Sequence, residues 1–246
     1  MINENGLILK ASSYKEKDKL LTFYASSLGK IQVLCKAARD PMNHWVSSID
    51  PPLLAWCSLL ERNHFFQLTD IREMNVFPGL REHYRSRLVY HALLQAIHYT
   101  EVAEPAEEPF RLFLETLLGI EKAPENAEWF YYRFMIHFLN LQGFQRDITT
   151  CIQCHTVISD DREPFYFSLD TASFLCPECA KKELNIVQVS QNVGSIWKKC
   201  QHSAPQDFLK EKVVFFHNFK DLDRIISVIV KQVFHQDFVS LAEIVL

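Results

Sequence analysis

The chain has 246 residues, of which 48% are hydrophobic and 13% aromatic, and it carries a formal net charge of −4. This size and composition exclude a disordered chain and predict a globular protein built from two structural units. The negative charge excludes a simple polycation that coats nucleic acid, and no apolar run is long enough to cross a bilayer. The chain also starts without the pattern of a signal peptide, so we expect a cytoplasmic protein with no membrane association.

Positive charge is concentrated near the N-terminus. Residues 1–39 carry seven lysine and arginine residues against three acids, whereas residues 76–150 carry seven against ten. Because phosphate groups bind where cations are concentrated, we expect any phosphate-binding face to lie near the N-terminus.

Residues 1–76 alternate short apolar segments with turn-forming residues. Ile31, Val33 and Cys35 occupy every second position, as in a strand with one buried face. Gly29 and the Asp50-Pro51-Pro52 segment mark turns. The predicted strands are Gly6–Ala11, Leu20–Tyr24, Lys30–Cys35, Leu53–Leu60 and Phe65–Ile71. Five short strands fit a small Greek-key barrel of the OB type, although an SH3-like barrel would give a similar pattern.

Residues 77–246 change to a helical period after Phe77-Pro78-Gly79. Apolar residues recur every three or four positions over 84–99, 110–118, 130–141 and 222–233, which predicts amphipathic helices that pack on one another. Gly143 follows the third stretch and is expected to end that helix as a C-cap. The fold class is therefore α+β, with an N-terminal barrel followed by a helical domain.

Two CxxC motifs interrupt the helical part of the chain. CIQC at 151–154 and CPEC at 176–179 can present Cys151, Cys154, Cys176 and Cys179 to one tetrahedral ion. We therefore predict a structural Zn²⁺ site in an inserted module, 151–179, with an aromatic hairpin between the motifs. A redox role is disfavoured because a thioredoxin-like βαβ context is missing. His155 could replace one ligand, but a solvent-facing position is favoured.

The remaining thiols and acids suggest no chemistry. Cys35, Cys57 and Cys200 are interpreted as small buried hydrophobic residues, and the Asp160-Asp161 pair as part of a turn. The sequence has no P-loop, dinucleotide fingerprint, nucleophile elbow or HExxH motif. Because four thiolates leave no coordination position for water, the metal is not expected to be catalytic. We predict no catalytic residues and no enzyme activity.

Three segments resemble the RecO family of recombination mediators, in the order in which that family has them. The segment GLILKASSYKEKDKLLTFYASSLGKIQVLCKAARDP resembles the family's opening, and FPGLREHYRSRLVYHALLQ resembles its entry to the helical domain. FLNLQGFQRDITTCIQC resembles its approach to the cysteines. The residues that match the opening motif are Tyr14, Glu16, Asp18, Gly29, Lys36, Ala38 and Arg39.

This resemblance implies a bacterial DNA-repair protein in the cytoplasm, associated with the nucleoid. Such a protein binds single- and double-stranded DNA, anneals complementary strands and engages RecR. It also contacts the C-terminal tail of single-stranded DNA-binding protein and helps to load RecA. One departure concerns the basic loop, where Ala37 replaces a glycine and Asp40 follows the cations. We expect a weaker phosphate grip in consequence.

An OB-type barrel binds single strands with a basic groove and stacking aromatic side chains. The predicted DNA contacts are Lys10, Lys17, Lys19, Lys30, Lys36, Arg39 and Tyr14, with Lys15 and Trp45 as further candidates. Lys36 and Arg39 rank first because they lie in the matching loop. The alternative for each lysine is a solvated strand end, and the alternative for Tyr14 is an aromatic residue of the core or rim.

The partner's tail is expected to be acidic with an apolar end, so its receptor needs a cation beside an apolar groove. Arg133 lies among Phe130, Tyr132, Phe134 and Ile136 and offers that pairing. The alternative for Arg133 is an outward-facing arginine on a core-facing helix. For the whole protein, the alternative function is a zinc-ribbon adaptor that binds only protein partners.

Overall fold

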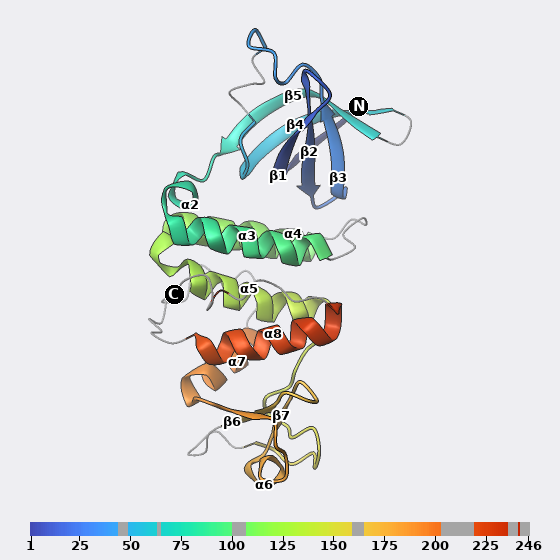
Figure 1. The fold of residues 1–246 in the computed structure, drawn as a ribbon. Coiled ribbons are helices and arrows are strands. Elements are labelled where there is room, and N and C mark those ends of the chain that lie inside the picture. The colour runs from blue at the N-terminus through green and yellow to red at the C-terminus, as the bar shows by residue number, and fades with distance from the viewer. Residues whose placement is uncertain are drawn as a thin grey trace.

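The computed structural model describes residues 1–43, 49–62, 65–99, 107–158, 165–202, 219–235 and 241. Figure 1 shows three parts along one axis, with a β-barrel at one end, a layer of helices in the middle and a small sheet with the cysteine motifs at the other end. Trp45 and the Asp160-Asp161 pair lie outside the described residues. No helix in the described part of the chain has both the length and the apolar character needed to cross a membrane.

The N-terminal strands close into the expected barrel of the OB type. They are β1 (Ile2–Tyr14), β2 (Asp18–Ala25), β3 (Gly29–Cys35), β4 (Leu53–Arg62) and β5 (Phe65–Asn75). Their order around the barrel is β1-β2-β3-β5-β4, which is a Greek key, and β3 runs parallel to β5 where Val33 faces Phe66. The predicted fold class is confirmed.

The inside of the barrel is filled by alternate residues of each strand. Leu21 and Phe23 of β2, Val33 of β3 and Ala55 of β4 belong to one buried cluster. Since successive side chains of a strand point to opposite faces, the residues between them point outward. Cys35 and Cys57 are in the same cluster, as predicted, and burial raises the pKa of each thiol to about 12.

The helical body is arranged around α5 (Ala127–Leu141), which contacts α3, α4, α7 and α8. Residues 127–139 of α5 are all buried, because a helix that is apolar on every side must be covered on every side. Its end is a Schellman motif, in which the Phe144 N–H donates to Leu139 O and Gly143 takes a φ of 81°. The predicted C-cap is thereby confirmed. The other members are α2 (Pro78–Glu82), α3 (Tyr84–Tyr99), α4 (Glu107–Lys122), η1 (Pro124–Asn126), α7 (Gln191–His202) and α8 (Lys220–Phe234).

The cysteine module contains a three-stranded sheet and one short helix. Its elements are β6 (Phe165–Ser168), β7 (Ser173–Leu175), β8 (Ile186–Val189) and α6 (Pro177–Ala180), with the sheet order β7-β6-β8. The predicted hairpin is the antiparallel β6–β7 pair, whereas β8 and the following α7 were not predicted. The Phe174 ring packs edge-on against Trp197 of α7, with 5.5 Å between centroids. The module is therefore part of the helical core.

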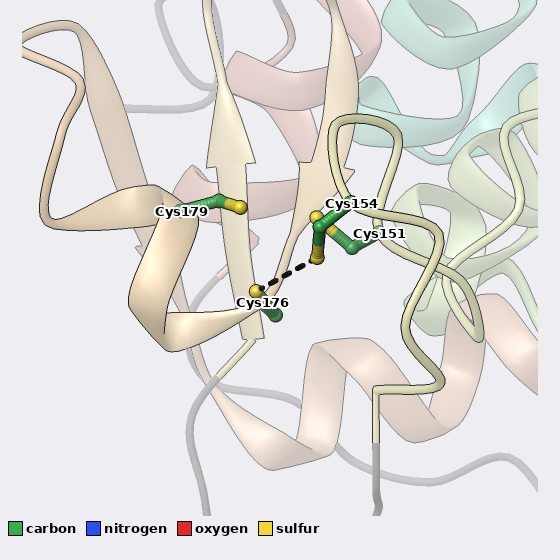
Figure 2. Close-up of side chains that lie close together, drawn as sticks. All are labelled: Cys151, Cys154, Cys176 and Cys179. Carbon is green, nitrogen blue, oxygen red and sulfur yellow. Dashed lines mark hydrogen bonds between the residues drawn. The ribbon is translucent and has the colours of Figure 1, made fainter.

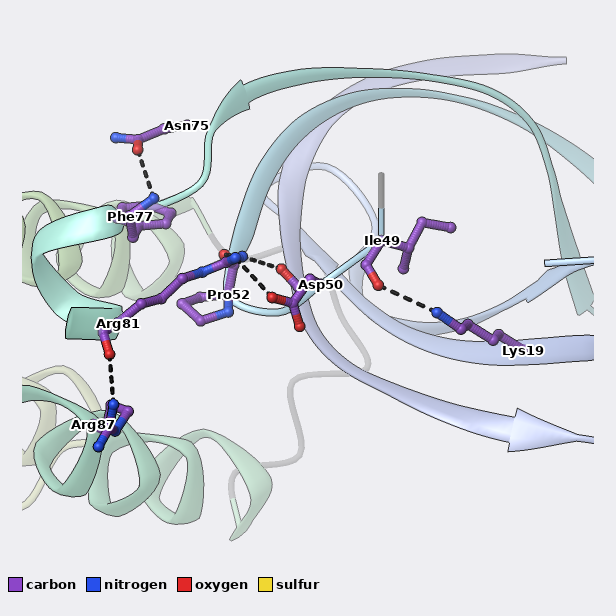
Figure 3. Close-up of polar contacts among 8 residues, drawn as sticks. All are labelled: Lys19, Ile49, Asp50, Pro52, Asn75, Phe77, Arg81 and Arg87. Atoms are coloured by element: carbon purple, nitrogen blue, oxygen red, sulfur yellow. Dashed lines mark hydrogen bonds and ion pairs between the residues drawn. The ribbon is translucent and has the colours of Figure 1, made fainter. Parts of the chain in front are cut away.

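Barrel and helices also share a packed junction. Arg81 of α2 donates to Asp50 Oδ2 at 2.7 Å and to Pro52 O at 2.9 Å, and so fixes the start of β4 to the first helix (Figure 3). Tyr90 Oη donates to Leu9 O at 2.8 Å. Leu9 and Tyr24 belong to the same buried cluster as the helices, so this side of the barrel is covered. The domain boundary at residue 76 stays a prediction.

Candidate nucleic-acid interface and metal centre

The four motif cysteines are delivered by two tight turns. In the first turn the Cys151 N–H donates to Thr156 O at 2.9 Å and the His155 N–H donates to Cys151 O at 3.0 Å. In the second, Cys176 follows β7 directly and occupies the N-cap position of α6, while Cys179 lies within α6. Each CxxC segment therefore curls back and presents two sulfurs to the same point.

The four sulfurs lie within 4.8 Å of one another, and those of Cys154 and Cys176 are 3.6 Å apart (Figure 2). Tetrahedral coordination with bonds of about 2.3 Å puts ligand sulfurs ~3.8 Å apart, so the cluster fits a single tetrahedral ion. Hydrogen bonds with Thr156 lower the pKa of Cys154 to about 6, whereas burial raises the pKa of Cys179 to about 12. His155 is exposed, as favoured from the sequence, and the cluster consists of cysteines alone.

A second group of candidate residues gathers at one end of the barrel. The β1–β2 turn and the loop after β3 lie side by side there, because the Arg39 N–H donates to Lys17 O at 2.8 Å. The Ala37 N–H donates to Asp18 Oδ1 at 2.9 Å and ties the same two segments together. We call the group of Tyr14, Lys15, Lys17, Lys36 and Arg39 the barrel-end cluster.

The side chains of the barrel-end cluster present cations and an aromatic ring to solvent. Tyr14 is 40% exposed, and the Lys15 ammonium lies 5.4 Å from the centroid of its ring. Lys36 and Arg39 are exposed, and Lys17 forms an ion pair with Asp40 at 3.4 Å. Asp40 therefore offsets one charge of the cluster, as expected from the sequence. Lys19 is half-buried beside the cluster and donates to Ile49 O at 3.4 Å (Figure 3).

Two predicted DNA contacts lie elsewhere on the barrel. Lys10 is exposed in the middle of β1, opposite Thr22. Lys30 lies at the junction, where its ammonium donates to Ile97 O at 2.9 Å and to His98 O at 3.1 Å. These carbonyls belong to the last turn of α3, so Lys30 caps that helix. Burial at this position lowers the pKa of Lys30. Its predicted role in DNA binding stays a prediction, while its ammonium is engaged by the helix.

Arg133 is inside the helical body, with 1% of its surface exposed. The alternative of an outward-facing arginine is therefore wrong, because α5 is covered on every side. A tail peptide would reach this guanidinium only by entering the helical body, and the partner-tail role stays a prediction.

The sequence did not reveal which residues organise the junction. Arg81 was visible only as a member of the matching FPGLR segment, and Tyr90 only as one position of a helical stripe. Asp18 was part of the motif, but its function of holding the loop after β3 becomes visible only in the structure. The carbonyl groups that accept these hydrogen bonds are distant in sequence from their donors, so no local sequence pattern indicates the contacts.

Comparisons with known proteins match both ends of the chain to one family. Residues 1–71 match the model described as recombination protein O N terminal, and residues 94–241 match recombination protein O C terminal. A DNA repair protein RecO of Acetivibrio thermocellus is 24% identical over 219 residues, covering 86% of this chain and 84% of that protein. Its counterpart in Thermodesulfovibrio yellowstonii is 28% identical over 182 residues, covering 71% and 68%. The chain therefore belongs to the RecO family.

Proposed function

We propose that the chain is a DNA-binding recombination mediator that binds and anneals single strands. Its relatives carry the name DNA repair protein RecO, and membership of their family supports a role in DNA repair. The observation that carries the DNA-binding proposal is the barrel-end cluster. It brings four cations and one exposed tyrosine from two separate segments to one end of a barrel whose type binds single strands.

The proposed mechanism needs no covalent chemistry. Cations of the cluster neutralise backbone phosphates, and the Tyr14 ring offers a face on which one base stacks. Two strands held close together with reduced mutual repulsion pair faster than strands free in solution. We further propose that the protein acts with RecR, contacts the tail of single-stranded DNA-binding protein and helps to load RecA. These partners are expected from membership of the family.

We propose Zn²⁺ as the ion of the cysteine cluster, in a purely structural role. Four thiolates satisfy the tetrahedral shell of zinc and close it to water and substrate. The ion would tie the two CxxC turns together and so hold the small sheet on the helical core.

A second candidate function, a protein-interaction adaptor, is favoured by the surface of the cysteine module. Ile152, Val157 and Leu184 are exposed there by 50%, 77% and 98%. Apolar side chains on a zinc module are suited to contact another protein. This candidate predicts no DNA affinity that depends on salt.

Binding of a labelled single strand across a salt series separates the two candidates. Each phosphate contact contributes about 0.7 to the slope of log affinity against log salt for single strands. A Lys36→Glu/Arg39→Glu variant should therefore bind more weakly and lose about 1.4 from the slope. The control is Lys182→Glu, an exposed lysine that follows α6, and α6 lies at the opposite end of the molecule from the barrel (Figure 1). Unchanged binding by the double variant would reject the site, and no binding by the wild-type chain would favour the adaptor.

A further inference from the structure

A cleft lies where the barrel meets the second half of α3. It has a volume of about 310 Å³ and opens to solvent beside Lys10 of β1. Leu9, Leu94 and Ile97 provide apolar walls, and Thr22 of β2 contributes a hydroxyl. Lys30 is also part of the lining, where it is held by the end of α3. We call this space the junction cleft.

The strand register connects the junction cleft to the barrel-end cluster. From Lys10 onward β1 pairs regularly with β2, so Lys10, Ser12 and Tyr14 point outward on the same face. At a rise of about 3.3 Å per residue, Lys10 and Tyr14 are ~13 Å apart along the strand. Tyr14 belongs to the barrel-end cluster and Lys10 opens the cleft. The outward face of β1 therefore connects the barrel-end cluster to the junction cleft.

The neighbouring strands continue this surface with groups that suit a base. Leu20 and Leu34 face each other between β2 and β3 and are half-buried, since the alternate residues Leu21 and Val33 fill the barrel. Next to them Gln32 Nε2 donates to the Thr22 hydroxyl at 3.2 Å. The surface thus has an apolar centre bordered by amide and hydroxyl groups. Flat heteroaromatic rings stack on apolar groups and pair with such polar groups.

Charge also favours an anionic ligand at the junction cleft. Among the described residues, the Lys10 ammonium makes no hydrogen bond or ion pair, and no acidic side chain lines the cleft. The Lys10 ammonium is thus available to bind a phosphate that is attached to a group inside the junction cleft. The volume lies at the small end of ligand pockets, about 300–1,000 Å³, which suits one base and excludes a base pair.

From this juxtaposition we infer that the junction cleft holds a single nucleobase of a DNA strand, with Lys10 on the adjacent phosphate. The inference rests on the proposed DNA-binding function and adds a second contact point to it. The strand runs from the barrel-end cluster along the outward face of β1–β3 to α3. A base in the junction cleft is withdrawn from stacking and pairing with other bases. The protein then contacts the strand at two places, the junction cleft and the barrel-end cluster.

Photo-crosslinking tests this path with the full chain. A single strand carries one 4-thiothymidine at successive positions, is bound at low salt and irradiated, and the cross-linked peptides are identified by mass spectrometry. We expect cross-links from one position to residues 94–98 of α3 and from another, several nucleotides away, to residues 14–17 or 36–39. A Lys10→Ala variant should lose most of the α3 cross-link and about 0.7 of the salt slope, whereas the control Lys182→Ala should lose neither.

Two results would overturn the inference. One is a strand that binds with normal salt dependence but cross-links only to the barrel-end cluster, which would leave the proposed function intact. The other is an acidic peptide ending in an apolar residue that cross-links to residues 94–98 where the DNA strand does not. That result would assign the junction cleft to a peptide. Failure of the proposed function is distinguishable, because no strand would then bind at any salt concentration.

Discussion

Removal of the proposed zinc ion should destabilise the helical body as well as the cysteine module. Cys151, Cys176 and Cys179 are buried in the same cluster as Phe174 and Trp197. Trp197 lies on α7 and its indole N–H donates to Arg146 O at 3.0 Å. Loss of the ion therefore releases a segment that is packed against the central helices.

The magnitude follows from the loop that the ion closes. Cys154 and Cys176, one from each motif, are 22 residues apart, and a cross-link over that length removes about 3 kcal/mol of entropy from the unfolded chain. For a chain of this size each kcal/mol shifts the melting temperature by about 2–4 °C. We therefore expect chelation to lower the melting temperature by roughly 10 °C.

The assay combines metal analysis with thermal melting under reducing conditions. The purified chain should contain one zinc ion, and a strong chelator should remove it and lower the melting temperature. A Cys176→Ala variant should lack the metal and melt at the same temperature with and without chelator. The control, Cys57→Ala, removes a buried thiol from the barrel and should keep both the metal and the response to chelator. A chelated protein that melts within about 2 °C of the untreated one, or a Cys176→Ala variant that keeps its zinc, would contradict this expectation.

Three further changes test local features. Ala37 has a φ of 52°, a conformation that costs a non-glycine residue about 1–2 kcal/mol. Ala37→Gly should therefore raise the urea concentration at the midpoint of unfolding, although glycine also makes the unfolded chain more flexible. Gly119→Ala should lower the urea midpoint of unfolding, because the added methyl overlaps the Phe130 ring at a cost of about 1–3 kcal/mol. The higher helix propensity of alanine stabilises the helix by only ~1 kcal/mol. Burial, followed by the charge of Arg133, lowers the pKa of His137 from 6.5 to about 4, so the unfolded chain takes up the proton first as pH falls. The free energy of unfolding should decrease by roughly 3 kcal/mol between pH 6.5 and pH 4, and a His137→Gln variant should show a flatter profile.

The strands of the barrel could be predicted because their buried faces alternate, but their full lengths could not. The sequence indicates Gly6–Ala11, whereas β1 runs over Ile2–Tyr14. Its ends are polar, and they are strand because β4 and β2 supply hydrogen-bond partners on either side. The parallel β3–β5 pair likewise forms only because the sheet closes into a barrel. No local pattern reports it.

The clustering of the four cysteines could be predicted from the sequence, while the roles of single cations could not. Four cysteines at fixed spacing specify their own geometry, and the structure brings all of them together. Lys30 and Arg133 illustrate the opposite case. Lys30 is engaged by carbonyls of α3 that are distant in sequence, and Arg133 is buried because neighbouring helices cover α5. An even distribution of apolar residues around α5 was the one available signal for that burial.

Strand annealing tests the central proposal most directly. Complementary oligonucleotides are coated with single-stranded DNA-binding protein and mixed with the chain over a series of salt concentrations. We expect that annealing is accelerated at low salt and that the acceleration decreases as salt rises. Lys36→Glu/Arg39→Glu protein should lose the acceleration, while Lys182→Glu protein should keep it. A wild-type chain that neither binds nor anneals strands at any salt concentration would contradict the DNA-binding proposal and leave the adaptor function.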